Sequence, residues 1–422
     1  MTGLVKLLTY PSSIIPDWVH PHLHLTTNDL LKKVMRGKPA DDPPMHKVVP
    51  FPRTPHTQQW PTPPSTLTYW VVPGSSSDSL HNESNFAAPP RTYVMATLNA
   101  TPDSFSDGGA HASVPAGLAY ARASITAGAS IIDIGGCSTR PGATPISAAE
   151  ESARVTPIIL SIRADSDAKA GATSLSNIPI SVDTFRPSVA YDALTAGANC
   201  INDVYACTGP AYPCDTESEE YFRGMLSAAR HFAAPVIMMH SRGPAGANKD
   251  YSAYNKNNAD ATDESRHTAP VLEGIRMELG SKVTRAVTGR GALRRWQVIV
   301  DPGLGFSKSV EDNLTILRHA KTITAEIATR SAWPLPKRSL RNPLAGYPLL
   351  IGASRKSFLG TILSRPATLE SKRSDGERQA KDRDFATAAA VTCAVQQGAT
   401  VVRVHEVQGM VDVVKVASAL RF

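Results

Sequence analysis

The chain has 422 residues, of which 42% are hydrophobic and 19% charged, and its formal net charge is +7 at pH 7. This length allows one large domain or two ordinary ones with a real core. No apolar run approaches the ~18 residues that a membrane-spanning helix needs, so we expect no membrane partner.

The basic residues are dispersed along the chain rather than gathered into a stripe interleaved with aromatic residues. Because such a stripe is typical of nucleic-acid binding, we expect no nucleic-acid partner. A small anionic substrate explains the positive charge equally well.

The five cysteines form no CxxC pair, which favours neither a disulfide framework nor a zinc site. We therefore expect a reducing, intracellular compartment, cytoplasmic or mitochondrial. The N-terminus shows neither a signal-peptide core nor an Arg-rich presequence, so it does not itself indicate import.

The first ninety residues differ in composition from the rest. Residues 39–90 are dense in proline and include GSSSDS, which is typical of a linker. Residues 27–35 (TNDLLKKVM) predict a short helix capped by Thr27 or Asn28. We predict an N-terminal extension over residues 1–90 and one folded domain over residues 91–422.

From Tyr93 onward one pattern recurs: a short apolar run, then polar or glycine residues, then an Ala-rich helical stretch. Helices are predicted over residues 115–129, 187–198 and 385–399, each closed by a glycine, namely Gly128, Gly197 and Gly398. Eight such runs are predicted as strands: Tyr93–Leu98, Ile131–Ile134, Ile178–Val182, Asn199–Ile201, Pro235–Met239, Val298–Val300, Leu349–Ile351 and Val401–Val404. Eight strand–helix units without a GxGxxG in the first turn favour an α/β fold of the (β/α)8 TIM-barrel type over a doubly wound sheet.

Functional groups of such barrels collect at the carboxyl ends of the strands. The residues there are Asn99, Asp133, Asp183, Asn202 with Asp203, His240, Asp301, Ser354 to Lys356, and Arg403 with His405. Short polar side chains directly after buried strands are costly without partners, so they indicate a site.

Alternatives remain for individual members of this set. Asp183 and Asp301 suit a planar heterocycle rich in N–H groups, but either could cap the following helix, and Asp183 fits that role better. Asp133 is at least as well explained by a packed polar network as by ligand contact. His240 could equally be a satisfied histidine at the edge of the core.

Cationic groups also converge on the ends of the second, seventh and eighth strands. They are Arg140, Arg355, Lys356, Arg403 and His405. Because loops after the last two barrel strands often bind phosphate, they indicate a phosphate or diphosphate. The alternation of RVH predicts Arg403 and His405 on one face of a strand. No Walker A sequence, GxSxG elbow or His/Cys metal cluster occurs.

Eight motifs at these strand ends together resemble dihydropteroate synthase of folate biosynthesis, particularly the form in fungal multifunctional folate enzymes. In order, they are LNATPDSFSDGG, DIGGCSTRPGA, ISVDTFRPSVA, INDV, VIMMHSRG, IVDPGLGFSKS, IGASRKSFLG and RVHEV. The resemblance covers residues 91–422. It implies a Mg²⁺-assisted transferase reaction that joins 7,8-dihydropterin-6-ylmethyl diphosphate to 4-aminobenzoate, releasing diphosphate. A neutral arylamine needs no strong general base, which agrees with the residues present.

The resemblance also implies roles for residues of this chain. Asn99 and Asp107 would bind the metal, and Asp183, Lys356, Arg403 and His405 would be the catalytic residues. Thr139, Arg140, Arg403 and His405 would hold the diphosphate. The pterin would be bound by Asp183, Asn202, Asp301 and Lys356, with Met239 and Gly352 also in the substrate site. The aminobenzoate pocket, where sulfonamides compete in this family, would be framed by Phe105, Pro141, Phe306, Lys356 and Ser357. Gly108 and Gly109 suggest that the first loop opens and closes as a lid.

Some features depart from the family pattern. Cys137 stands where many bacterial members have an acidic residue, and polar insertions at residues 161–177, 208–230, 245–295 and 366–383 are expected to be surface excursions. Residues 14–35 look like the tail of a pyrophosphokinase domain, so the chain could be one piece of a longer multifunctional protein. Family members commonly form homodimers through the outer helices.

Two other functions remain open at this point. A corrinoid-dependent pterin-binding methyltransferase shares the barrel and the pterin contacts, but its substrate carries no diphosphate for STRPG, SRKS and RVH to bind. A catalytically inactive pterin-binding barrel could serve as a scaffold, although Asn99, Lys356, Arg403 and His405 are all present.

Overall fold

The computed structural model describes residues 92–100, 113–138, 144–165, 174–255, 269–289, 291–325, 342–364 and 380–420. The N-terminal extension, with its predicted linker and short helix, lies outside these ranges.

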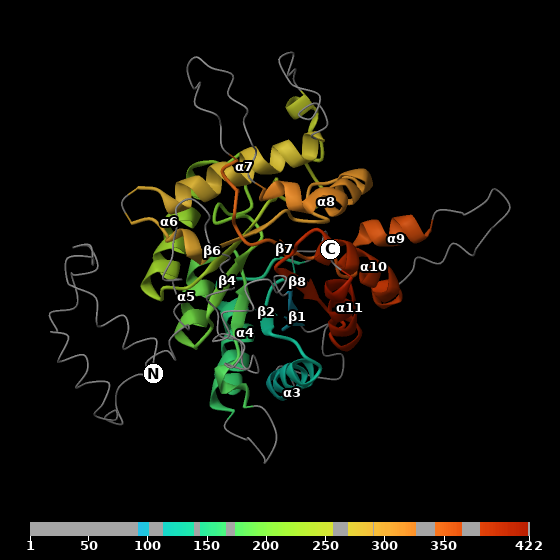
Figure 1. Cartoon of the computed structure of the whole chain (residues 1–422). Helices are drawn as coiled ribbons and strands as arrows, with labels where there is room; N and C mark the ends of the chain where they lie inside the picture. The colour runs from blue at the N-terminus through green and yellow to red at the C-terminus, as the bar shows by residue number, and fades with distance from the viewer. Residues whose placement is uncertain are drawn as a thin grey trace, which may run out of the picture.

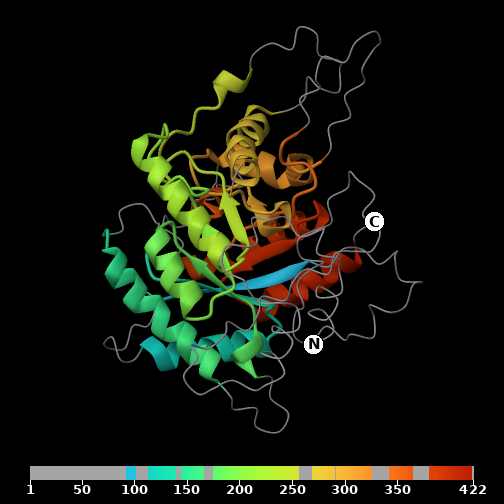
Figure 2. The same ribbon diagram turned by 90° about the vertical axis from the view of Figure 1, so that its left-hand side faces the viewer.

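Eight parallel strands form the centre of the molecule (Figures 1 and 2). They are β1 (Tyr93–Asn99), β2 (Ile131–Gly135), β3 (Ile180–Asp183), β4 (Cys200–Asp203), β5 (Val236–Met239), β6 (Val298–Asp301), β7 (Leu350–Ile351) and β8 (Val401–Val404). Their order is β6-β5-β4-β3-β2-β1-β8-β7, and a bridge between Val300 and Leu349 joins the two ends. The predicted (β/α)8 barrel is therefore confirmed.

Each predicted strand overlaps an observed one, and the largest offsets are two residues, at the end of β4 and at the start of β3. Strand β3 was expected from Ile178 but begins at Ile180. Pro179 has no N–H to donate to the ladder, and only its carbonyl takes part, accepting from Ile132 N at 3.1 Å.

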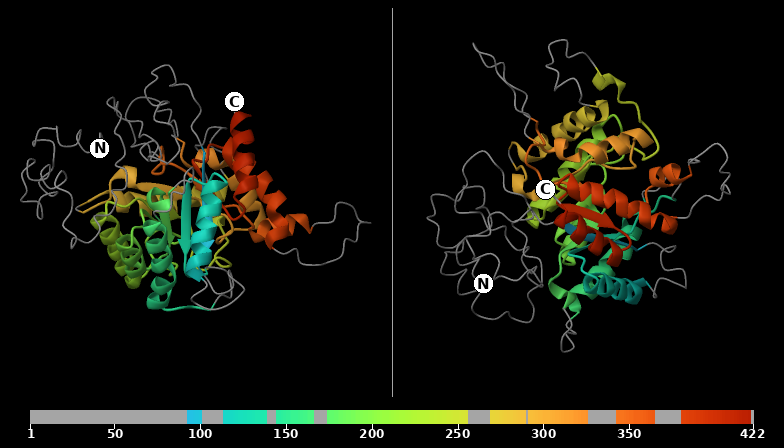
Figure 3. Two further views of the ribbon diagram at one scale, coloured as in Figure 1. Left: turned by 90° about the horizontal axis from the view of Figure 1, so that it is seen from below. Right: turned by 45° about the vertical axis from the view of Figure 1, so that its right-hand side comes forward.

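Helices surround the strands, as two further views show (Figure 3). They are α3 (Ser113–Thr126), α4 (Ala148–Ala164), α5 (Pro187–Thr195), α6 (Thr216–His231), α7 (Pro270–Val287), α8 (Val310–Ile323), α9 (Ser357–Leu363), α10 (Asp384–Gln396) and α11 (Gln408–Ala419), with 3-10 turns η7 (Leu175–Asn177), η8 (Ser252–Asn255), η9 (Arg295–Gln297) and η10 (Ala380–Arg383). The three predicted helices are α3, α5 and α10, and the glycines that follow them have φ of +104°, +113° and +84°. In the described part of the chain, no helix is long and apolar enough to cross a membrane.

The interpretation of residues 208–230 and 245–295 as surface excursions is wrong for their helical parts. They contain most of α6 and all of α7, whose inner faces carry buried residues such as Phe222, Met225 and Ile275. Their outer faces are polar, and that composition hid the helical spacing of the apolar residues. In residues 161–177, Leu175 of η7 is buried as well. Of residues 366–383, only those of η10 are described.

Side-chain alternation along the strands explains where the core ends and the site begins. Seven strands each contribute one residue to a buried cluster separate from the helix-facing core: Met95, Ile131, Cys200, Ile237, Ile299, Leu350 and Val401. Because strand side chains alternate with a period of two, the residue two positions later points to the same side. These residues include Thr97, Asp133, Asn202, Met239, Asp301 and Arg403. The barrel interior is therefore apolar in one layer and mostly polar in the next, toward the carboxyl ends.

Candidate active site

An arginine on the last strand bridges two carboxylates on earlier strands. Arg403 of β8 donates from Nε to Oδ2 of Asp133 on β2 at 2.6 Å, and from Nη2 to Oδ2 of Asp183 on β3 at 2.7 Å. Asn202 of β4 donates from Nδ2 to the same Asp133 oxygen at 3.1 Å. Asp133, at 0% exposure, therefore belongs to a packed polar network, one of its two predicted roles.

The pKa values of this group follow from burial and from the pairing. Burial raises the pKa of Asp183 to about 7, against the opposing effect of Arg403 and with help from the nearby charge of Asp133. Burial acts to lower the pKa of Arg403, but the two carboxylates hold it above its usual range. Asp183 can thus change its charge near neutral pH, whereas Arg403 stays charged.

Asp183 does not cap the helix that follows it. The N-cap residue of α5 is Arg186, and no side chain caps that position. The Arg186 side chain instead pairs with the fully buried Glu151 of α4 and donates from Nη2 to Ile146 O at 2.8 Å, which ties down the segment before α4. This ion pair was not predicted from the sequence.

Asp301 lies across the barrel at the end of β6. Its Oδ1 accepts a hydrogen bond from Gly303 N at 2.7 Å, so the carboxylate closes a tight turn as well as facing the mouth. Burial raises its pKa to about 6. A Cβ on Gly352, just past β7, would lie 4.0 Å from Asp301 Oδ2, which places these two predicted substrate residues side by side.

An apolar wall stands next to these polar groups. Met239, Phe306 and Val204 form a separate buried cluster at the ends of β5, β6 and β4. The Lys356 ammonium lies 4.4 Å from the centroid of the Phe306 ring. Lys356 is the N-cap residue of α9, and the exposed Ser357 begins that helix. The structure therefore brings together Met239 from the end of β5, Phe306 from the loop after β6 and Lys356 from the loop after β7.

The other cationic groups divide between two environments. His405 follows β8, and both its backbone N and its Nδ1 lie within 3.2 Å of Ser354 Oγ after β7. Arg355 forms two bonds of 2.8 Å with Asp384, the first residue of α10, so it is committed to holding that helix. Arg355, one of the converging cations predicted from the sequence, is thus paired with an outer helix of the barrel.

His240 is a buried histidine with a partner for each ring nitrogen, which is one of the two roles predicted for it. Its Nε2 lies 3.0 Å from Glu278 Oε2, and its Nδ1 lies 3.0 Å from Lys308 Nζ. Burial and the neighbouring Lys308 lower its pKa to about 3, so the ring is neutral. Glu278 lies in a stretch expected to be a surface excursion, which is why its part in this cluster was not predicted.

Several predicted site residues lie outside the described residues: Phe105, Asp107, Thr139, Arg140 and Pro141. The half-buried Asn99 ends β1, level with Gly135 of β2. Within the described ranges, no three His, Cys, Asp or Glu side chains gather as a metal site.

Comparison with known proteins gives a consistent result. The family model described as "Pterin binding enzyme" matches residues 95–405. A dihydropteroate synthase of Synechocystis sp. is 38% identical over 330 residues, covering 78% of this chain and 90% of that protein. The chain belongs to the dihydropteroate synthase family. It is a transferase that makes dihydropteroate, which decides against the methyltransferase alternative.

Two further likenesses extend this result. The folic acid synthesis protein of Pneumocystis carinii is 34% identical over 336 residues, covering 80% of this chain but 36% of that protein. The predicted resemblance to fungal multifunctional folate enzymes is thereby confirmed. A solved dihydropteroate synthase of Xanthomonas albilineans with 4-aminobenzoic acid superposes with a TM-score of 0.56 at 32% identity, covering 78% of this chain and 93% of that one.

The residues of this dihydropteroate synthase fit a divalent metal ion of the hard, oxygen-binding kind. Asn99 offers an amide oxygen at the end of β1, the type of ligand that Mg²⁺ accepts. Mg²⁺ is usually held by one or two protein oxygens together with substrate phosphates, so no larger protein cage is needed.

Proposed function

We propose that this chain joins 7,8-dihydropterin-6-ylmethyl diphosphate to 4-aminobenzoate at the carboxyl ends of its barrel strands. The observation that carries the proposal is the Asp183–Arg403 pair, 2.7 Å apart, at the mouth of the barrel. It places an anion and a cation where a pterin cation and a diphosphate anion would separate during the reaction.

The polar side of the mouth would bind the pterin. Asn202 donates a hydrogen from Nδ2 to Asp133, so the Oδ1 atom of Asn202 can accept a hydrogen bond from a ligand. Asp183, Asn202 and Asp301 then offer acceptors on three strands for the N–H groups of the ring. Asp183 would also offset the positive charge that spreads over the ring as diphosphate departs.

The apolar wall of Met239 and Phe306 would hold 4-aminobenzoate, beneath Lys356 and beside Ser357, Phe105 and Pro141. The amine lone pair attacks the methylene carbon of the pterin, the bond from that carbon to diphosphate oxygen breaks, and the nitrogen then loses a proton to solvent. No side chain needs to act as a strong base, because an arylamine is already neutral at pH 7.

The diphosphate would be held by Arg403, His405, Thr139 and Arg140. An arginine has five N–H donors, and Arg403 gives two of its nitrogens to Asp133 and Asp183, so others remain for an anion. Asn99, with Asp107 of the first loop, would hold Mg²⁺. The metal supplies charge stabilisation to the leaving diphosphate when bound.

The wider context of the chain is part of the same proposal. We infer that residues 1–90 are an extension derived from the tail of a pyrophosphokinase domain, since residues 14–35 resemble one and the fungal relative is much longer than its matching region. We also infer a homodimer and an intracellular location, in the cytoplasm or in mitochondria.

Diphosphate release on mixing both substrates with Mg²⁺ tests the reaction. We expect release that requires both substrates and falls in Lys356→Ala but not in Arg318→Met, which removes an exposed ion pair on α8. No release from a folded wild type that still binds pterin would overturn the proposal in favour of an inactive pterin-binding barrel.

A further inference from the structure

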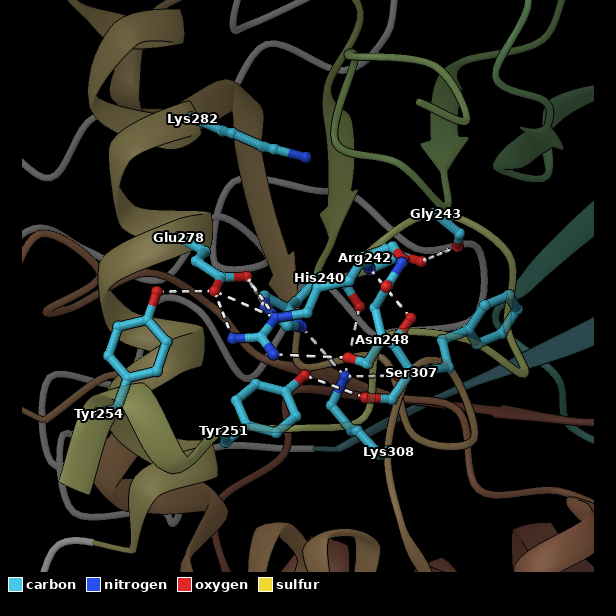
Figure 4. A network of polar contacts seen from close by, with 12 residues as sticks. His240, Arg242, Gly243, Asn248, Tyr251, Tyr254, Glu278, Lys282, Ser307 and Lys308 are labelled. Atoms are coloured by element: carbon cyan, nitrogen blue, oxygen red, sulfur yellow. Dashed lines mark hydrogen bonds and ion pairs between the residues drawn. The ribbon is translucent and has the colours of Figure 1, made fainter. Parts of the chain in front are cut away.

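A buried polar cluster lies beside the site, between α7 and the loops that follow β5 and β6 (Figure 4). We define it as His240, Arg242, Glu278 and Lys308. Arg242 donates to both Glu278 oxygens, with its shortest contact at 2.6 Å, and its guanidinium carbon lies 3.7 Å from the centroid of the Tyr251 ring. None of these four residues is needed for the chemistry above.

The loop that follows β6, residues 302–309, depends on outside partners for its shape. Gly303, Gly305 and Ser307 have φ of +72°, +78° and +51°. A Cβ on Gly303 would lie 2.0 Å from His240 O, so only glycine fits there. Ser307 is a non-glycine residue in the left-handed region, a conformation that persists only when its surroundings impose it.

Neighbouring residues impose that conformation on Ser307. Its N donates to Ala245 O at 2.7 Å, its Oγ accepts from Arg242 N at 3.1 Å, and its O accepts from the Tyr251 hydroxyl at 3.2 Å. The loop after β6 is thus built against the loop after β5.

Lys308 completes this arrangement from inside the protein. At 4% exposure, its Nζ lies 2.9 Å from Phe306 O, 3.0 Å from His240 Nδ1 and 3.5 Å from His240 O. An ammonium has three N–H donors and no acceptor, and these partners supply three acceptors.

His240 links Lys308 to Glu278 of α7. Because the Glu278 carboxylate can only accept, the neutral ring must carry its proton on Nε2, which leaves Nδ1 to accept from Lys308. Glu278 is fixed in turn by Arg242 and by the Tyr254 hydroxyl at 2.7 Å. A chain of contacts therefore runs from α7 through His240 and Lys308 to the Phe306 carbonyl.

Phe306 is the residue of this loop that faces the substrate site. Its ring packs with Met239 and Val204, and Lys356 lies over it. Asp301, by contrast, is fixed within the sheet, where its Cα pairs with Met239 and its carbonyl accepts from His240 N at 2.8 Å. Loss of the Lys308 amine would release Phe306 more than Asp301.

We propose that Lys308 is a positioning residue for 4-aminobenzoate: through His240 and Glu278 it anchors the Phe306 carbonyl to α7 and so sets the wall of the amine pocket. This inference rests on the proposed function, in which Phe306 lines that pocket. It adds a residue that touches neither substrate but decides how well one of them fits.

The test uses the full chain with Lys308→Met. We expect the KM for 4-aminobenzoate to rise about tenfold, since a small displacement of a positioning group weakens one contact selectively. The pterin dissociation constant should stay unchanged when it is measured at pH 8, because the Lys308 charge also lowers the pKa of Asp301, which is about 6. Arg276→Met is the matched control. It removes another buried cation that donates to a backbone carbonyl, that of Thr322 at 2.9 Å, away from the strand-end residues. It should cost stability without moving either constant.

Glu278→Gln provides a second route if Lys308→Met fails to fold. We expect it to raise the same KM by a smaller factor, and an unchanged KM in this variant would overturn the proposal in that case. Where Lys308→Met does fold, the double variant should show no more than the Lys308→Met effect, since both act through one chain of contacts. An unchanged KM in a folded Lys308→Met, or the same rise in Arg276→Met, would overturn the proposal.

Binding measurements separate this failure from failure of the proposed function. If the wild type releases no diphosphate, calorimetry can still measure the binding of dihydropteroate and of pterin. Lys308→Met should then weaken dihydropteroate binding about tenfold and leave pterin binding unchanged. Equal effects on the two ligands would overturn the positioning role of Lys308 and would leave the proposed function untouched.

Discussion

Arg403 and Asp183 connect the eighth strand of the barrel to the third, with Nη2 of one 2.7 Å from Oδ2 of the other. These strands are not neighbours in the sheet, where β2 and β1 lie between them. The contact therefore crosses the mouth of the barrel, and it places an ionisable group whose pKa lies near neutrality next to a permanent cation.

Asp183→Asn should lower kcat about 100-fold and weaken pterin binding, because a neutral amide cannot offset charge that develops on the ring. In the wild type, the ionised form of Asp183 grows as pH rises through about 7, so turnover should rise over the same range. Steady-state diphosphate release from pH 5.5 to 8.5, at about half-unit steps, measures both effects. A variant with wild-type kcat, or one that keeps the acidic limb, would remove Asp183 from the mechanism.

Lys356→Ala should weaken binding of both substrates about tenfold each, because the ammonium lies over the Phe306 ring and its stem packs against Gly305. Calorimetric titration with each ligand measures this. Lys356→Arg should recover part of the aminobenzoate affinity, since it restores the cation over the ring. If only aminobenzoate binding changed in the alanine variant, the predicted pterin contact of Lys356 would be wrong.

Arg403→Met should destabilise the fold by about 3–5 kcal/mol, because it leaves the fully buried Asp133 without its charged partner. Arg318→Met is the matched comparison, since its partner Glu311 is 69% exposed, and it should cost at most about 1 kcal/mol. Urea unfolding of both variants at pH 7 gives the difference. Equal losses would mean that the Asp133–Arg403 pair contributes little to stability.

The barrel could be predicted from the sequence because its signals are local. Helices that end at Gly128, Gly197 and Gly398 alternate with short apolar strands, and each strand is followed at once by a polar residue or a glycine. The position of Asp183, Asn202 and Asp301 at one end then follows from the fold alone.

Pairings between distant residues could not be predicted in the same way. Asp133 and Arg403 are 270 positions apart, and the sequence around either residue contains no signal that identifies the other as its partner. Glu278 illustrates a second reason. It lies on α7, whose polar outer face resembles a surface insertion, so its contact with His240 emerges only when α7 packs against the strand ends.

The closure between β6 and β7 has a consequence for local stability. β7 has two residues, and Val300 N donates to Pro348 O at 3.0 Å beside the single bridge to Leu349. With so few ladder bonds, this part of the wall can separate at lower free energy than the long pairing of β1 with β2. The residues on its two sides, Asp301 and Gly352, are both predicted from the sequence to lie in the substrate site. A ligand that spans them would hold the barrel shut and slow amide exchange there more than elsewhere.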